Sequence, residues 1–451
     1  MDETVTAVTP TRRPWLAVVP DTAPRRHLSF PQLLALSAIW FAIAYLMNTL
    51  GGITIPYLVK ALTRPTTIQL LGIHFTADKN TYVAILDTAG AIFALVWQPA
   101  IGALSDRSRF RWGRRRPYIA IGIVGDVIFL SAMAFVTSYW MLIVVYMFMQ
   151  MASNTAQGPY QGMLPDQVPD EQRAEASGYY GLLQLIGTIV GFIVIGAVLL
   201  PAGHVRLAIF SYVAVTAIAG ALVIFAMPDV RTTRVDSSPV GRAIFLSFAI
   251  DVRHYRDFAW LMVSRLFFLM APVGISSFSF NFIQDTFRLS SGQASTQAAL
   301  LQAGVVVFAA IASITAGFAA RRFGKKRLIS VSCIIGAIGS ALLIFAPSFT
   351  LIFLFGCLVG LALGMFLSVD WAFMTDLIPK AEAGRYMGVS NIATVSAGLI
   401  ARPILGPIID AFNNGRTSTA GYRVMFGMVA GFFLLAWVTL RPVREIRVEA
   451  Y

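Results

Sequence analysis

Long apolar segments alternate with short polar connections along the chain, from Phe30 almost to its end. Each apolar segment is about 20 residues long or longer, which is the length that a helix needs to cross about 30 Å of hydrocarbon. The segments are too long and too uniformly apolar for barrel strands, the other structure that satisfies its backbone in lipid. The pattern predicts twelve membrane-spanning helices, called spans 1 to 12, at 32–58, 81–104, 117–136, 139–163, 178–200, 206–227, 258–283, 296–319, 328–346, 350–374, 387–411 and 421–440.

Composition supports a membrane protein, because 57% of the residues are hydrophobic, 13% are charged and the mean hydropathy is +0.72. The net charge of +13 comes from basic residues in short connections at helix ends, which membrane topology explains without nucleic-acid binding. If both termini lie on one side, 26 of the 35 Lys and Arg residues fall on that side. By the positive-inside rule, we expect a multi-pass protein of the cell (inner) membrane with both termini cytoplasmic.

Two loop motifs recur in the chain at nearly the same offset. The basic loop Gly113–Arg116 after span 2 is echoed 211 residues later by Gly324–Arg327 after span 8, and Asp166 after span 4 is echoed 210 residues later by Asp376. Such repetition predicts two six-helix pseudo-repeats that run in parallel. The expected organisation is an N-tail, a first bundle, a cytoplasmic linker, a second bundle and a C-tail, at 1–29, 30–227, 228–257, 258–441 and 442–451.

The connection after span 2 concentrates charge between two apolar segments. Asp106 ends span 2, where a carboxylate opposes the helix dipole and gains from a cationic partner. A basic loop that serves only topology would need no such aspartate, although this alternative stays open. The charged residues of the connection that we single out are Asp106, Arg107, Arg114, Arg115 and Arg116.

This connection also carries a family resemblance. Together with Gly102 and Pro117, its residues resemble the loop signature of the major facilitator superfamily, in the WGRRRPYI form of the sucrose/proton symporters and their glycoside/cation symporter relatives. The stretch NTAQGPYQGMLPD, residues 154–166, resembles a segment of span 4 in the plant sucrose carriers. The resemblance implies two halves that rock about a central site. It also implies that the charged loop forms a cluster between the halves and gates the cytoplasmic side.

Polar residues inside spans are costly and point to a pathway or to helix packing. On span 4, Gln150, Asn154 and Gln157 fall at i, i+4 and i+7 and therefore share one helical face. Amides offer both donors and acceptors, as sugar hydroxyls do, so this face is a candidate solute site; hydrogen bonding between helices is the alternative. Further candidates for the same cavity are Asn48, Gln98 and Asn281.

The carboxylates inside spans limit the coupling chemistry. The plant sucrose carriers have a titratable aspartate on span 4, and the corresponding residue here is Gln150. The melibiose carriers bind their cation with two aspartates on span 2, which here correspond to Ala94 and Gln98, so sodium is less expected than a proton. We identify Asp87 and Asp126 as the intramembrane carboxylates that could carry the proton, with a structural hydrogen bond as the alternative for Asp126.

Arg402 on span 11 is the basic residue whose depth agrees with that of Asp87. The resemblance places spans 2 and 11 against each other across the two halves. We therefore predict an ion pair between Asp87 and Arg402 that closes the outer side and, when it separates, lets the carboxylate take up a proton. A static buried pair that only holds the fold is the alternative.

The sequence thus favours a secondary transporter that takes up a sugar or glycoside, such as a sucrose- or maltose-like disaccharide, with a proton. A superfamily transporter or exporter of another amphiphilic solute is the alternative. An enzyme is not expected, because the four histidines lie outside the spans and no nucleophile or metal-ligand spacing occurs. No metal or cofactor is expected, and the predicted unit is a monomer in the bilayer.

Overall fold

The computed structural model describes residues 18–20, 27–70, 73–227, 229–231, 255–377, 383–413 and 418–444. Nearly all of these residues are helical, and each of the twelve predicted spans is a helix or a continuous helical run. The predicted fold class, an all-α membrane protein of two six-helix halves, is confirmed. Most of the predicted linker and of both tails lies outside the described residues.

In the first half, the elements are β1 (Val18–Pro20), α1 (Phe30–Thr49), the π-helical segment η2 (Leu50–Thr54), α2 (Ile55–Leu62), β2 (Thr66–Leu70), β3 (Ile73–Ala77), α3 (Lys79–Asp106), α4 (Arg116–Met133), α5 (Tyr139–Gln161), α6 (Met163–Gln167), the 3-10 turn η3 (Asp170–Gln172), α7 (Arg173–Gly191), the π-helical segment η4 (Phe192–Leu199), α8 (Val205–Ala226) and β4 (Asp229–Arg231). In the second half, they are α10 (Arg256–Phe287), α11 (Ser291–Phe323), α12 (Lys325–Leu343), α13 (Phe349–Asp376), α14 (Ala383–Asn413) and α15 (Ala420–Leu440).

Eleven helical runs in the described part of the chain are long and apolar enough to cross a membrane. The run that falls short is α5, because polar side chains interrupt the second half of this helix, among them Gln150, Asn154 and Gln157. Its neighbours α3 and α4 cover it on two sides. The same polar residues that drew attention in the sequence therefore lower the hydropathy of one span.

Spans 1 and 5 differ from the single helices that the sequence predicts. Span 1 passes through η2, where the N–H of Ile55 bonds to the carbonyl of Leu50, and span 5 ends in η4, where the N–H of Leu200 bonds to that of Ile195. These bonds close i→i+5 turns, which are rare and occur mostly as short insertions at functional sites.

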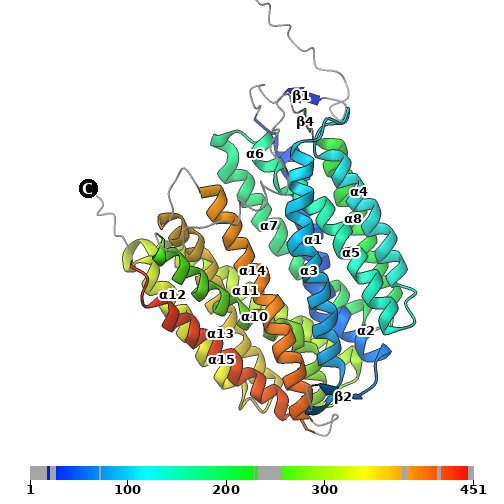
Figure 1. Cartoon of the computed structure of the whole chain (residues 1–451), viewed down its shortest axis with the longest axis vertical. Helices are drawn as coiled ribbons and strands as arrows, with labels where there is room; N and C mark the ends of the chain where they lie inside the picture. The colour runs from blue at the N-terminus through cyan, green and yellow to red at the C-terminus, as the bar shows by residue number, and fades with distance from the viewer. Residues whose placement is uncertain are drawn as a thin grey trace, which may run out of the picture.

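Two short sheets mark the ends of the molecule. The antiparallel pair β2–β3 follows span 1, and the parallel pair β1–β4 lies beyond the end of α8. We call these ends the hairpin end and the linker end; they lie at the bottom and the top of Figure 1. At the hairpin end α3 packs against α14, and α11 against η4, whereas the two bundles diverge towards the linker end (Figure 1). The halves are therefore closed at one end and apart at the other.

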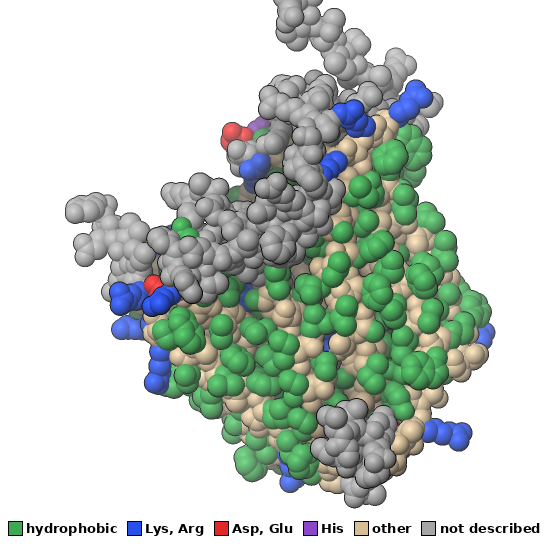
Figure 2. Space-filling view, viewed as in Figure 1, with side chains coloured by type: hydrophobic (Ala, Val, Ile, Leu, Met, Phe, Trp, Pro, Cys, Tyr) green, Lys and Arg blue, Asp and Glu red, His purple; other side chains and the backbone are tan. Residues whose placement is uncertain are grey.

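The surface agrees with a lipid environment. In Figure 2, apolar side chains cover the face over most of its height, and Lys and Arg gather near the two ends. Inside each half, glycines let helices approach closely: a Cβ on Gly122 of α4 would lie 2.4 Å from the backbone nitrogen of Ala156 on α5. Contacts of this kind hold membrane helices together where no hydrophobic force acts between them.

Candidate functional site

A cavity of about 920 Å³ lies between the two halves. Its walls come from α7 and η4 in the first half and from α10, α11 and α13 in the second, with Asn48 of α1 at one end. A volume of this size is within the range of sites that bind small molecules. None of the described residues that line it is charged.

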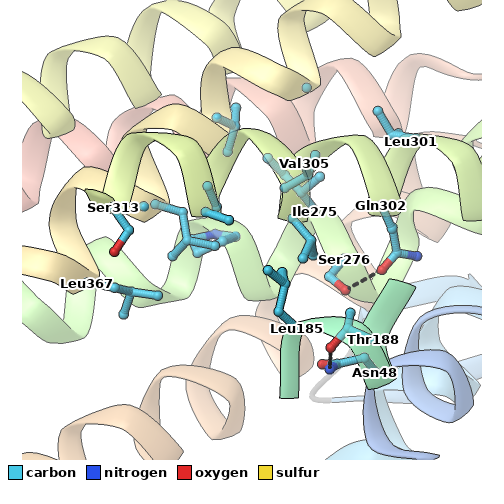
Figure 3. Close-up of a pocket in the computed structure, with 18 of the residues that line it drawn as sticks. Asn48, Leu185, Thr188, Ile275, Ser276, Leu301, Gln302, Val305, Ser313 and Leu367 are labelled. Atoms are coloured by element: carbon cyan, nitrogen blue, oxygen red, sulfur yellow. Dashed lines mark hydrogen bonds between the residues drawn. The ribbon is translucent and has the colours of Figure 1, made fainter. Parts of the chain in front are cut away.

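Polar groups gather at one end of this cavity. The Nδ2 of Asn48 donates to the Oγ1 of Thr188 at 2.9 Å, and the hydroxyl of Ser276 donates to the Oε1 of Gln302 at 2.9 Å. Figure 3 shows these two pairs near each other, one from each half. The remaining wall is mainly apolar, with Val305, Leu363 and Leu367 among its residues. The cavity thus has these hydrogen-bonded pairs at one end and mainly apolar contact along its length, with Ser177, Gln184 and Ser313 as further polar lining residues.

Of the predicted solute residues, Asn48 lines this cavity. The three amides of α5 do not line it, and α5 packs between α3 and α4. Asn154 donates to the backbone carbonyl of Gln150, and Gln157 lines a second, smaller cavity. A Cβ on Gly90 of α3 would lie 3.0 Å from the Cγ of Gln150. The polar lining residues of the cavity come from both halves, and the solute-binding role of the α5 amides stays a prediction.

Gln98 and Asn281 also lie outside the lining of this cavity. Gln98 is at a close contact between α3 and α5, where a Cβ on Gly158 would lie 2.8 Å from its backbone oxygen. Asn281 is fully buried and donates from Nδ2 to the Oδ1 of Asn80 at 2.9 Å. It therefore joins α10 of the second half to α3 of the first.

The predicted ion pair between Asp87 and Arg402 is confirmed. The Nε of Arg402 lies 3.3 Å from the Oδ2 of Asp87 and donates to the hydroxyl of Ser277 at 2.9 Å. The hydroxyl of Tyr146 donates to the other carboxylate oxygen of Asp87 at 3.5 Å. Asp87 is only 3% exposed, so Arg402 supplies its opposite charge across the two halves. The role of the pair in coupling stays a prediction.

Asp126 lies inside the first half. Its Oδ1 accepts a hydrogen bond from Ser153 at 2.6 Å, which links α4 to α5. With Ser153, Gln157 and Thr216, Asp126 lines the smaller cavity of about 20 Å³, which is room for about one water molecule. This geometry favours the structural alternative for Asp126, and a role in proton transfer stays a prediction.

The hairpin end contains a carboxylate that the sequence-based predictions did not include. Asp410 of α14 accepts hydrogen bonds from the backbone N–H groups of Asp78 and Thr81, from the Thr81 hydroxyl and from Asn80, all at 2.7–2.8 Å. These groups form the start of α3, so a side chain of the second half caps a helix of the first. A carboxylate is favoured at this position because it accepts from the N–H groups that the first turn of a helix leaves unpaired. The positive end of the helix dipole also attracts its charge.

A second contact across the halves lies beside this cap. Lys79, which is 1% exposed, pairs with Asp285 of α10 at 2.5 Å, and the hydroxyl of Tyr422 donates to the same carboxylate at 2.6 Å. Asn80 also donates to Tyr422 at 3.3 Å. The first turn of α3 is therefore held by α10, α14 and α15 together.

The prediction that Asp87 and Asp126 are the intramembrane carboxylates was wrong, because Asp370 and Asp410 also lie inside predicted spans. Asp370 is fully buried on α13 and pairs with Arg265 of α10, which donates in turn to Thr394 at 3.0 Å. The cost of charge in lipid was the signal that led to Asp87, and it applies equally to these residues.

The charged loop at the linker end forms a cluster with two further aspartates. Arg115 pairs with Asp106 at 2.9 Å and with Asp166, and Arg114 pairs with Asp166 at 2.6 Å. The backbone N–H groups of Arg115 and Arg116 donate to Asp229 at 2.8 and 2.9 Å, and Arg107 caps the end of α3. Asp106 and Asp166 belong to the first half, and Asp229 lies at the start of the predicted linker. The gating role of this cluster between the halves stays a prediction.

The second half repeats part of this cluster. Lys325 of α12 pairs with Asp376 of α13 at 2.5 Å, in the place where Arg114 and Arg115 pair with Asp166 in the first half. The two loop motifs found in the sequence are thus ion-pair partners in each half, which supports the parallel repeat.

Comparison with known proteins decides the family. The model of the Major Facilitator Superfamily matches residues 28–305 and 266–450. The chain belongs to the major facilitator superfamily. Members of this superfamily are transporters and not enzymes, and the chain is accordingly a multi-pass membrane transporter of a small solute.

Within the superfamily, the chain is similar to plant sucrose carriers. It is 22% identical to sucrose transport protein SUT5 of Oryza sativa subsp. indica over 86% of each chain. It is 30% identical to sucrose transport protein SUC3 of Arabidopsis thaliana over 28% of this chain and 24% of that one. These similarities support the sucrose/proton symporter-like branch.

Solved structures show the same fold at lower identity. The nucleoside transporter NupG matches with a TM-score of 0.69 and 15% identity, over 92% of this chain and 99% of that one. An inward-facing, occupied bacterial homolog of the human lysosomal transporter Spinster matches with a TM-score of 0.69 and 14% identity, over 91% and 96%. Both support the major facilitator architecture.

Proposed function

We propose that this transporter takes up a sugar or glycoside together with a proton by alternating access. The observation that carries the proposal is the cavity between the halves, whose described lining has hydrogen-bonding side chains at one end and no charge. A charged solute would lose its hydration there without gaining a counterion. Amides and hydroxyls such as those of Asn48, Ser276 and Gln302 suit the hydroxyl groups of a neutral sugar. The similarity to sucrose transport proteins supports the same class.

The direction of opening follows from topology. The positive-inside rule assigns the linker end to the cytoplasm, so the state described here is open inward and closed outward. Outward opening would require the ion pair of Asp87 with Arg402 to separate. A carboxylate left in apolar surroundings without its cation is costly, and a proton taken up from outside removes that cost. This sequence of events couples proton entry to the movement of the halves.

A second candidate is a transporter of a different neutral, amphiphilic solute. The apolar wall along most of the cavity favours a solute with an apolar face, and the fold is shared with a nucleoside transporter. Import and export are both compatible with this alternative.

Uptake into proteoliposomes tests the two candidates. Labelled sucrose, maltose and uridine are offered at two pH values, with and without a protonophore. We expect an inward proton gradient to drive accumulation of a sugar and the protonophore to abolish it. Accumulation of uridine alone would favour the second candidate, and sugar uptake that ignores both pH and protonophore would contradict proton coupling.

A further inference from the structure

One side chain at the polar end of the cavity also belongs to the closed hairpin end. Gln302 of α11 lines the cavity, and its Nε2 donates to the backbone carbonyl of Gly52 in η2 at 3.4 Å. Gln302 is 8% exposed, and a Cβ on Gly52 would lie 2.8 Å from its amide atoms. A larger residue at 52 would displace the amide, and the contact joins the second half to the first beside the solute site. Figure 3 shows Gln302 at this end of the cavity.

The same face of α11 makes a second contact with a π-helical segment. Seven residues before Gln302, the hydroxyl of Ser295 donates to the carbonyl of Gly196 in η4 at 2.7 Å, and Ala299 between them packs against Gly196. A carbonyl oxygen has two lone pairs and can accept such a bond beyond its helical one. Both π-helical segments thus present a glycine carbonyl to α11. Ser295 does not line the cavity, whereas Gln302 does.

The partners of Gln302 fix which way its amide points. Its Oε1 accepts from Ser276 at 2.9 Å, and its Nε2 also donates to Ser279 at 3.1 Å. The Gly52 carbonyl can only accept, and the Ser279 hydroxyl donates its own proton to the carbonyl of Ser276 at 3.1 Å, so both hold Nε2 on their side. Both amide protons are then used, and one acceptor position on Oε1 is left for a donor. When the hairpin end opens and Gly52 withdraws, Ser279 is the acceptor among these three partners that still holds Nε2, so the amide is less firmly oriented.

We propose that Gln302 is the residue through which a solute in the cavity stabilises the closed hairpin end. A solute hydroxyl that donates to Oε1 finds this acceptor held most firmly while Gly52 is in contact. A ligand shifts a conformational equilibrium by its difference in affinity for the two states, so solute binding and hairpin-end closure favour each other. This inference rests on the proposed sugar function, because it needs a solute with hydroxyl donors.

Spin-label distance measurements across the hairpin end test the inference. Cysteines replace the exposed residues His204 and Ala420, one in each half, after Cys333 and Cys357 have been changed to alanine. Without solute, Gln302→Glu, which loses the donor, and Gly52→Ala, which displaces the amide, should each lower the ratio of closed to open molecules by about fivefold, the effect of one hydrogen bond. Ser295→Ala removes the hydrogen bond to the Gly196 carbonyl and should lower the ratio of closed to open molecules by a similar factor. This variant provides a partly open reference.

The solute is then added to that partly open reference. Sucrose should restore the closed distance in Ser295→Ala, with sorbitol at equal concentration as the control, and should fail to do so in Ser295→Ala/Gln302→Glu. Restoration in both variants overturns the inference, as does a wild-type distance distribution in both Gln302→Glu and Gly52→Ala. If sucrose has no effect on Ser295→Ala, the sugar function is contradicted, and the measurements without solute decide by themselves whether Gln302 holds the hairpin end closed.

Discussion

The two ends of the molecule use the same chemistry in different ways. At the hairpin end, Lys79, Asn80 and Asp87 bind partners in the second half, whereas at the linker end Arg115 and Lys325 bind aspartates of their own half. Pairs within one rigid half persist when the halves rock, but pairs between halves must break. Among the described residues, these charged contacts between the halves lie at the hairpin end, and the linker-end pairs of Arg115 and Lys325 stabilise their own halves.

Burial differs between individual carboxylates of the two ends, although Arg115 and Asp166 at the linker end are also largely buried. Asp410 is 2% exposed, while the side chains of Asp106 and Asp376 are 53% and 41% exposed. Exposed ion pairs contribute about 0–1 kcal/mol, and removing one partner of a buried pair costs about 3–5 kcal/mol. The comparison thus predicts large conformational effects from substitutions at the hairpin end and small ones at the linker end.

The largest effect is expected from Asp410→Ala. It removes the acceptor for four hydrogen bonds at the start of α3, and hydrogen bonds to a charged group contribute about 1.5–3 kcal/mol each. We expect the ratio of closed to open molecules at the hairpin end to fall more than about 100-fold, with loss of transport. The spin-label distance across the hairpin end measures this shift.

Asp376→Ala is the matched control, because it removes a carboxylate of the same half at the linker end. It should leave the hairpin-end distance unchanged, and Asp410→Asn, which keeps an acceptor, should give an intermediate value. Equal effects of Asp410→Ala and Asp376→Ala would refute the assignment of closure to the hairpin end.

The next effect concerns Asp87, whose partner also lies in the other half. Asp87→Asn cannot lose or gain a proton, so a proton gradient should no longer concentrate the solute, although exchange down its gradient continues. Accumulation and counterflow in the same proteoliposomes measure the two activities separately. Gln150→Ala, on the neighbouring α5, serves as a control that keeps every carboxylate. Undiminished accumulation by Asp87→Asn would assign the proton elsewhere, with Asp126 as the next candidate.

How much of this could be predicted from the sequence depends on the interaction. The membrane spans could be predicted from the sequence, because a helix in lipid requires a long apolar run whatever its neighbours are. The ion pair of Asp87 with Arg402 could also be predicted, since charges inside spans are few and need partners. The role of Asp410 was within reach of the same argument, but its four donors at the start of α3 depend on the packing of the closed halves.

The solute-facing residues were harder to predict. Helical periodicity predicts that Gln150, Asn154 and Gln157 share a side of α5, but it does not say which helices they meet. Gln150 lies beside Gly90 of α3, and Gln157 lines a small cavity with residues of α1 and α4. The contact of Gln302 with Gly52 depends on a π-helical turn, for which the sequence shows only two adjacent glycines, Gly51 and Gly52. Such features arise from tertiary packing and have no periodic signature.

A smaller effect on conformation, with a clear effect on stability, is expected from Arg115→Ala. Arg115 is buried and joins Asp106, Asp166 and the carbonyl of Pro159 within the first half. Its loss leaves Asp166 with Arg114 alone, so the stability of the protein should fall by about 2 kcal/mol or more. Thermal unfolding of the purified transporter measures this, and the hairpin-end distance should stay as in the wild type. A shifted distance would show that the cluster also acts between the halves.

The smallest effect is expected from Asp106→Asn. The direction in which it shifts the conformational population tests the comparison between the two ends. In the state described here the carboxylate is half exposed and pairs with Arg115 of its own half, so its loss should change stability by no more than about 1 kcal/mol. If the loop also latches the halves when the linker end closes, the substitution weakens only that other state. The population then shifts further towards the inward-open form, and turnover falls more than solute affinity does. Accessibility of a cysteine at Ser313, in the wall of the cavity, together with uptake rates at saturating solute, reports both quantities. Unchanged accessibility and unchanged uptake would restrict the cluster to the stability of the first half, and the hairpin end would then be the part of the molecule in which charge controls the rocking movement.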